Sequence, residues 1–223
     1  MIWYPLYSFA RVATTTRATY NPRAACYLSV TYRKLKWQTK TRYTIPHNNI
    51  YFPYEVMYMD KLKRDTIIGL LFVLITGTLA HFLYGWTGKN IVAGLFTPVN
   101  ESVWEHMKLI FFPMLLFSSV AIFLLKNQYP CISSAFYIGI LIGTALIPIL
   151  FYAYTAILNT NYLFLDIAVF FISAALAFFV SYKLTLSCKG KPYTLLSLLL
   201  VGVLFACFLI FTYQPPNVPL FLE

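Results

Sequence analysis

The sequence has 223 residues, of which 60% are hydrophobic and only 11% are charged, and its mean hydropathy is +0.69. A soluble domain usually carries about 25% charged residues, so this chain has too few charges to cover its surface with polar groups. The net charge of +10 would fit nucleic-acid binding, but the hydrophobic remainder indicates basic flanks of membrane helices, and we expect no nucleic-acid partner.

Residues 1–59 differ in composition from the rest of the chain. They hold eight of the 17 Lys and Arg residues, nine of the 18 Tyr residues and one acid, Glu55. No apolar run is long enough for a signal peptide, and neither helix nor strand periodicity persists. A disordered basic tail, an organellar transit peptide and a misplaced translation start all fit this segment. We favour the misplaced start, because Met57 and Met59 directly precede a charged lead-in to the first span.

Five apolar blocks in residues 60–223 each reach the length of about 20 residues that a helix needs to cross a bilayer. They predict an all-α integral membrane bundle with the lipid bilayer as its partner. The expected spans are 66–86, 101–125, 132–157, 163–182 and 194–213. A loop with a short re-entrant piece is expected between the first two. Pro113 and Pro148 lie inside the second and third spans, where the missing backbone donor predicts kinks.

The connections between these spans alternate in charge, which predicts an orientation. Residues 159–161 and the tail after Tyr213 carry no Lys or Arg before the chain ends. In the connection between the first two spans, Lys89 and Lys108 are offset by Glu101 and Glu105. The segment before the first span and the connections after the second and fourth spans are basic, through Lys61, Lys63, Arg64, Lys126, Lys183, Lys189 and Lys191. Basic loops stay in the cytoplasm, so we expect a plasma-membrane protein with its N-terminus inside and its C-terminus outside.

With this topology, ionisable and polar side chains gather at the outer end of the bundle. This polar cluster comprises His81, Asn100, Glu101, Glu105, His106 and Asp166. Such groups are costly near a bilayer, so their gathering indicates a functional site. Asn100 is expected to cap the second span, which would place Glu101 and Glu105 on one helix face. Asp166 has apolar neighbours in sequence and needs a partner, for which His81 or His106 is suited.

The side chains of the polar cluster allow metal binding and acid–base chemistry. His81, His106 and Asp166 could bind a divalent metal through mixed nitrogen and oxygen ligands, and Glu101 or Glu105 could act as a general base. No H-E-x-x-H pair supports this, and we expect no other cofactor. Simpler roles compete with these functions. Glu105 and Lys108 could pair on a wet helix surface, and the whole cluster could be a structural polar cap.

Other polar and aromatic residues suggest structural roles. Interfacial positions are expected for Trp86, Tyr152, Tyr154 and Tyr213, as in the aromatic belts of membrane proteins. The cysteines show neither metal-ligand spacing nor a disulfide framework, so we assign no such role to Cys26, Cys131, Cys188 or Cys207.

Two runs of sequence resemble a known family. They are HFLYGWTGKN at residues 81–90 and GLFTPVNESVWEHMKL at residues 94–109. They are similar to an uncharacterised bacterial family of multi-span membrane proteins, domain of unknown function 6512. FYAYT at 151–155 and YQPP at 213–216 are similar to it too. The resemblance covers about residues 60–223 and implies a bacterial multi-span protein without an assigned activity. A bacterial origin would remove the transit-peptide interpretation.

Three functions fit these observations. Transport of a small solute, ion or proton, or an accessory role in it, would use the kinked helices and the small residues Gly139, Gly143 and Ala145. With five spans and no inverted repeat, it would need a homo-oligomer. A metal-assisted hydrolase at the outer leaflet would use the polar cluster. A structural or sensory protein would bind a partner through residues 87–108. The sequence has no nucleophile elbow, phosphate-binding loop or cofactor fingerprint, which favours a non-enzymatic role.

Overall fold

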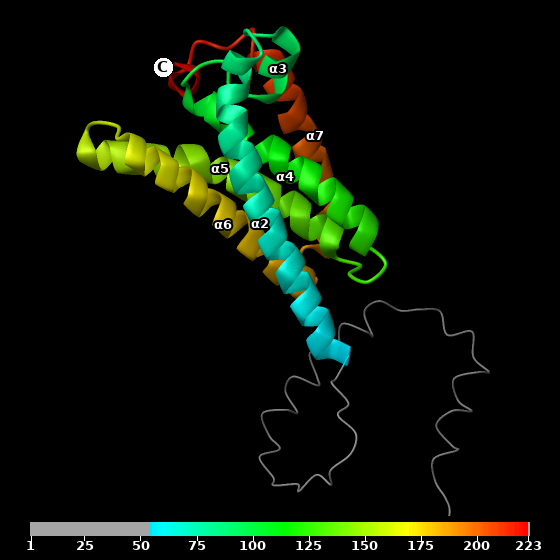
Figure 1. Ribbon diagram of the computed structural model, residues 1–223. Helices are drawn as coiled ribbons and strands as arrows, with labels where there is room; N and C mark the ends of the chain where they lie inside the picture. Colours follow the sequence, from blue (N-terminus) through cyan, green and yellow to red (C-terminus); the bar gives the residue numbers. More distant parts are fainter. Residues whose placement is uncertain (1–53, 223) are drawn as a thin grey trace, which may run out of the picture. The chain divides into compact units, whose positions relative to one another are not determined.

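A computed structural model describes residues 54–222, with side chains from Lys61 onward (Figure 1). The secondary structure of these residues is helical: α2 (Tyr54–Trp86), α3 (Ile91–Phe96), α4 (Val103–Leu125), α5 (Ile132–Leu158), α6 (Leu163–Ser187), η1 (Lys191–Tyr193), α7 (Thr194–Phe211) and η2 (Pro219–Phe221). The predicted all-α membrane bundle is confirmed, because five helices are long and apolar enough to cross a membrane. The interpretations of residues 1–53, including Cys26, concern a segment outside the described residues.

The second membrane helix begins later than predicted. Asn100 does not cap α4; its Oδ1 instead accepts a hydrogen bond from the backbone N–H of Ser102 at 3.1 Å. Ser102 is the N-cap, and its Oγ accepts from the N–H of Glu105 at 3.4 Å. The expectation for Asn100 was therefore wrong, because a tight turn uses its side chain before the helix starts. Glu101 consequently lies outside the helix, and it does not share a helix face with Glu105.

The short helix α3 lies in the connection where a short re-entrant piece was expected. Asn90 caps it, because its Oδ1 accepts from the backbone N–H groups of Val92 and Ala93 at 2.9 and 3.3 Å. Its position is fixed from the far end of the chain, where the Tyr213 hydroxyl donates to the carbonyl of Ile91 at 2.8 Å. Burial raises the pKa of Tyr213, with smaller effects of Tyr84 and Glu105, so its hydroxyl keeps the proton that it donates.

Close approach between helices depends on small residues, as is common where helices associate in membranes. A Cβ atom on Gly143 of α5 would lie 2.6 Å from the Cβ of Ala177 on α6. A Cβ atom on Gly77 of α2 would lie 2.6 Å from the carbonyl oxygen of Leu109 and 2.7 Å from Cζ of Phe170. Gly77 therefore brings α2 against both α4 and α6. His81 follows Gly77 by about one helical turn.

A disulfide bond joins Cys131 to Cys188. The interpretation that neither residue takes part in a disulfide was therefore wrong. The two residues are 57 positions apart in sequence, but Cys131 directly precedes α5 and Cys188 directly follows α6. Because α5 and α6 are antiparallel neighbours, their distant ends meet, which sequence spacing alone does not reveal. Cys207 is a free cysteine in α7.

Candidate functional site

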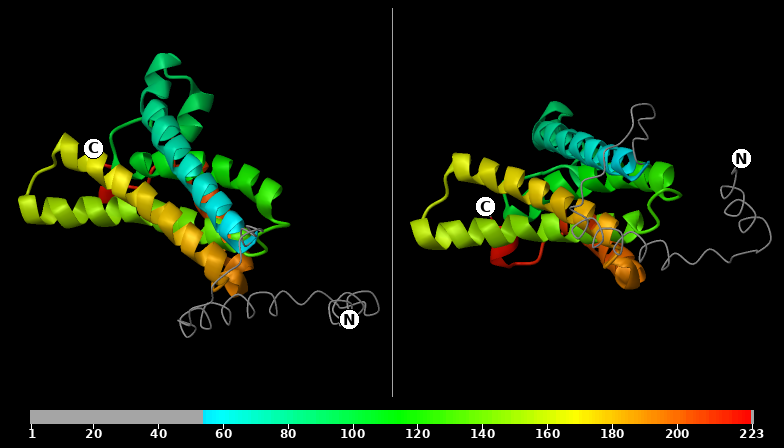
Figure 2. Two further views of the ribbon diagram at one scale, coloured as in Figure 1. Left: turned by 60° about the horizontal axis from the view of Figure 1, so that its bottom comes forward. Right: turned by 90° about the horizontal axis from the view of Figure 1, so that it is seen from below.

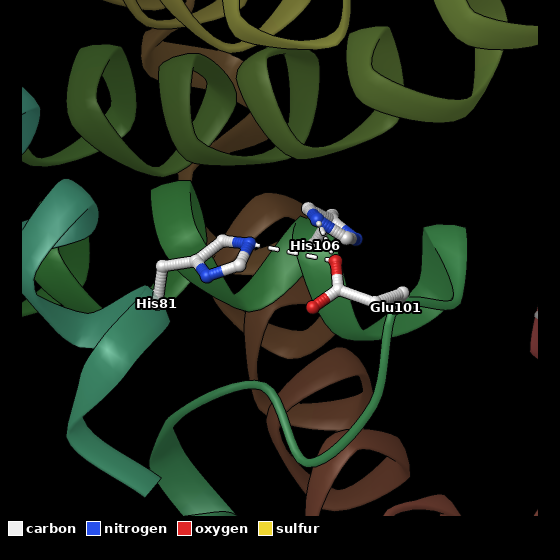
Figure 3. A group of neighbouring side chains, drawn as sticks. All are labelled: His81, Glu101 and His106. Carbon is white, nitrogen blue, oxygen red and sulfur yellow. Dashed lines mark ion pairs between the residues drawn. The ribbon is translucent and has the colours of Figure 1, made fainter. Parts of the chain in front are cut away.

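Three side chains from separate segments meet at one end of the bundle (Figure 3). His81 comes from α2, Glu101 from the turn before α4, and His106 from the first turns of α4. Glu101 Oε2 lies 3.6 Å from His81 Nε2 and 3.4 Å from His106 Nε2. The two imidazole ring centres are 5.3 Å apart. The structure therefore brings together three members of the polar cluster around one point.

The spacing of these three atoms suits a metal ion. One nitrogen or oxygen atom from each residue can be chosen so that all three lie within 4.8 Å of one another. Two tetrahedral ligands that each lie about 2.1 Å from a zinc ion are separated by about 3.4 Å. The nitrogen–oxygen separations of 3.4 and 3.6 Å at this site are close to that value. Two imidazoles and a carboxylate are also a ligand set of catalytic zinc sites.

The orientation of His106 is fixed by the backbone. Its Nδ1 lies 2.9 Å from the carbonyl oxygen of Ser102, which can only accept a hydrogen bond. Nδ1 therefore carries the proton, and in the neutral ring the lone pair is on Nε2, which faces Glu101. This arrangement of carbonyl, imidazole and free Nε2 is the usual support for a metal-binding histidine.

A cavity of about 770 Å³ opens beside these residues. His81, Glu101 and His106 line it, and so does Asp166 from the first turn of α6. The remaining lining is largely apolar and comes from α4, α5, α6 and the C-terminal tail. Its volume falls in the range of about 300–1,000 Å³ that small-ligand sites occupy.

Asp166 has a different partner from the expected histidines. The hydroxyl of Tyr154 on α5 donates a hydrogen bond to Asp166 Oδ1. This contact holds the carboxylate in one orientation at the edge of the cavity. Tyr154 is therefore more than a member of an aromatic belt, because it positions an ionisable group. His81 and His106 instead face Glu101.

Glu105 and Lys108 form a buried ion pair, so the expectation of a wet helix surface was wrong. Their side chains are 3% and 0% exposed, and Lys108 Nζ lies 2.7 Å from Glu105 Oε2. Lys108 also donates to Thr212 Oγ1 at 2.6 Å and to the carbonyl of Gly94 at 3.1 Å. Glu105 Oε2 accepts in addition from the N–H of Val99 at 3.0 Å. The Glu105 carboxylate is therefore occupied by Lys108 and by the backbone of Val99, and it does not line the cavity. Both observations argue against its use as a general base.

This buried network also supports the three-residue group. Lys108 connects α4 to α3 and to the end of α7, and Glu105 connects α4 to the segment that precedes it. Glu101 belongs to that same segment, which has no regular helix of its own. The network therefore fixes the backbone from which Glu101 reaches the two histidines.

A family model described as "Family of unknown function (DUF6512)" matches residues 54–223 of the chain. No curated protein matches the sequence, and no solved structure matches the fold.

Proposed function

Because the chain belongs to the DUF6512 family, whose function is unknown, we propose its activity from the site alone: a metal-dependent hydrolase embedded in the membrane. The observation that carries this proposal is the convergence of His81 Nε2, Glu101 Oε2 and His106 Nε2 at the cavity edge. Three protein ligands leave a fourth position for water or substrate, which distinguishes catalytic from structural zinc sites.

Asp166 is suited to handle protons in such a reaction. A divalent ion held by the three ligands would polarise an ester carbonyl and make a bound water more acidic. Asp166 would accept a proton from the attacking water as its oxygen bonds to the carbonyl carbon. The bond from that carbon to the alcohol oxygen would then break, and Asp166 would return the proton to the leaving oxygen. One ester and one water give one acid and one alcohol, without oxidation or reduction.

The first test measures hydrolysis of p-nitrophenyl acetate by the purified protein in lipid vesicles. We expect zinc-dependent release of nitrophenol that is lost on chelation and restored by added zinc. Asp166→Asn should lower the rate by about 100-fold or more, as loss of a general base usually does, and leave zinc affinity unchanged. Asp65→Asn is the matched control, because Asp65 pairs with Arg64 far from the cavity, at the opposite end of α2 from His81. Equal rates for the Asp166 and Asp65 variants would refute the role of Asp166.

The other two functions have less support. An ion pathway would place a desolvated charge beside the buried apolar residues Leu109, Ile147 and Val169, which line the deeper part of the cavity. Partner binding through residues 87–108 has one observation in its favour, because Ile91 and Val92 of α3 are exposed apolar residues. Neither observation accounts for the grouping of two histidines with a carboxylate.

The distribution of charge supports an orientation with the site outside. The end of the bundle opposite the site carries Lys61, Lys63, Arg64, Lys126 and Lys189, and basic flanks stay in the cytoplasm. Cys131 and Cys188 would then face the cytoplasm, where disulfides are usually kept reduced. The disulfide between them is therefore an observation that favours the opposite orientation.

Reporter fusions at Glu223 in a bacterial host test this orientation. Alkaline phosphatase fused to this residue should be active, because it folds outside the cytoplasm. Green fluorescent protein fused to the same residue should not fluoresce, because it does not fold there after export. The opposite result, an inactive phosphatase and a fluorescent green fluorescent protein, would reverse the orientation and place the disulfide on the outer side.

A further inference from the structure

The cavity changes from polar to apolar along the helix axes. On α4, Leu109 lines it about one turn deeper than His106, and on α6, Val169 lies about one turn deeper than Asp166. The antiparallel α5 contributes Ile147, which is deeper than Tyr152. Leu109, Ile147 and Val169 are buried, whereas Glu101 at the mouth has a side chain that is 70% exposed. The cavity therefore offers a polar mouth and an apolar floor toward the middle of the bundle.

The cavity mouth adjoins surfaces that meet lipid in a membrane. Leu163 on α6 lines the cavity and is 76% exposed, and Leu222 of the tail also lines it and is exposed. Next to the site, α2 exposes Phe82 and α6 exposes Phe164 and Ile167. In Figures 1 and 2, α2 and α6 cross and then diverge toward this end of the bundle. Exposed apolar side chains of α2, α6 and the tail therefore border the cavity mouth.

From this polarity we propose that the substrate is a membrane amphiphile, an acyl ester whose carbonyl lies at His81, Glu101 and His106 and whose chain lies along Leu109, Ile147 and Val169. This inference rests on the proposed hydrolase function and adds the class of its substrate. A chain in that position covers the apolar residues of the floor, which would otherwise face water in the cavity. A small water-soluble ester would leave the apolar floor unused. The cavity is too small to enclose a whole two-chain lipid, so the rest of the molecule stays in the bilayer.

The test compares p-nitrophenyl palmitate in vesicles with p-nitrophenyl acetate in water, using the full chain loaded with zinc. We expect the wild type to have the higher kcat/KM on the long ester. Val169→Trp fills the floor and should lower that value by about 10-fold or more, the effect of one badly accommodated group in an apolar pocket. The same variant should lose less activity on acetate than on palmitate, because only the long ester reaches the floor. Ile147→Phe, a smaller change on a different helix, should act in the same direction.

Val203→Trp is the matched control, because Val203 is exposed on α7 and does not line the cavity. It should leave both activities unchanged. Equal losses on the two esters in Val169→Trp and Ile147→Phe would overturn the proposed chain position, and so would a wild type that prefers acetate. A wild type that hydrolyses neither ester would overturn the hydrolase itself. The activity on acetate therefore distinguishes the two failures: it remains if only the proposed substrate class is wrong, and it is absent if the protein is not a hydrolase.

Discussion

Replacing His106 with alanine is expected to lower the zinc affinity of the protein by more than about 100-fold. Loss of a group that merely supports a metal ligand costs about 10- to 100-fold in affinity, and His106 is proposed as a ligand itself. Its Nε2 faces Glu101, and its ring is held by the Ser102 carbonyl. Among the described residues, His81 is the only other imidazole at the site, so no further histidine can take the place of His106. Isothermal titration of the detergent-solubilised protein with zinc measures this change.

Two further variants show whether that loss is specific. His81→Ala should produce a loss of similar size, because its Nε2 completes the same group from α2. Asp65→Asn should bind zinc like the wild type, because Asp65 is paired with Arg64 at the opposite end of α2 from His81. Unchanged binding in His106→Ala would remove His106 from the ligand set.

Replacing Lys108 with methionine is expected to reduce the free energy of unfolding by about 3–5 kcal/mol. The change leaves the Glu105 carboxylate buried without its cation and removes the hydrogen bonds to Thr212 and Gly94. Titration with sodium dodecyl sulfate in mixed micelles, followed by circular dichroism, measures the unfolding. Lys126→Met is the matched control, since Lys126 is an exposed lysine at the other end of α4.

A double replacement shows how much of that loss comes from leaving the Glu105 carboxylate buried without a cation. Glu105→Leu combined with Lys108→Met removes both charges, and buried pairs replaced in this way are often as stable as the original. We expect the double variant to recover most of the stability that Lys108→Met loses. If Lys108→Met costs no more than Lys126→Met, the network is not a structural support for the segment that carries Glu101.

The membrane spans were predictable because bilayer thickness sets the length of an apolar helix. The third predicted span, residues 132–157, differs from α5 (Ile132–Leu158) by one residue at its end. The start of α4 was less predictable, because Asn100 and Ser102 are both good capping residues and only the turn geometry decides between them. That difference of two residues is what separates Glu101 from Glu105 and sends their side chains to different partners.

Most contacts of the site depend on how the helices pack against one another, which the sequence alone does not show. Tyr154 and Asp166 lie at equal distances in sequence on either side of Thr160, in the turn between two antiparallel helices, and this symmetry could have predicted their hydrogen bond. The burial of Glu105 and Lys108 had no such signal, because it depends on Thr212, which is 104 residues away from Lys108 in sequence. The disulfide was hidden for the same reason.

The most direct test of the metal site is X-ray absorption at the zinc edge of the wild-type protein loaded with one zinc ion per chain. The site predicts two imidazole nitrogens at about 2.0–2.1 Å together with carboxylate oxygen at about 2.0–2.2 Å, and the loss of one imidazole in His81→Ala or His106→Ala. A spectrum with oxygen ligands alone, or one that is identical in the wild type and both variants, would contradict the proposed site.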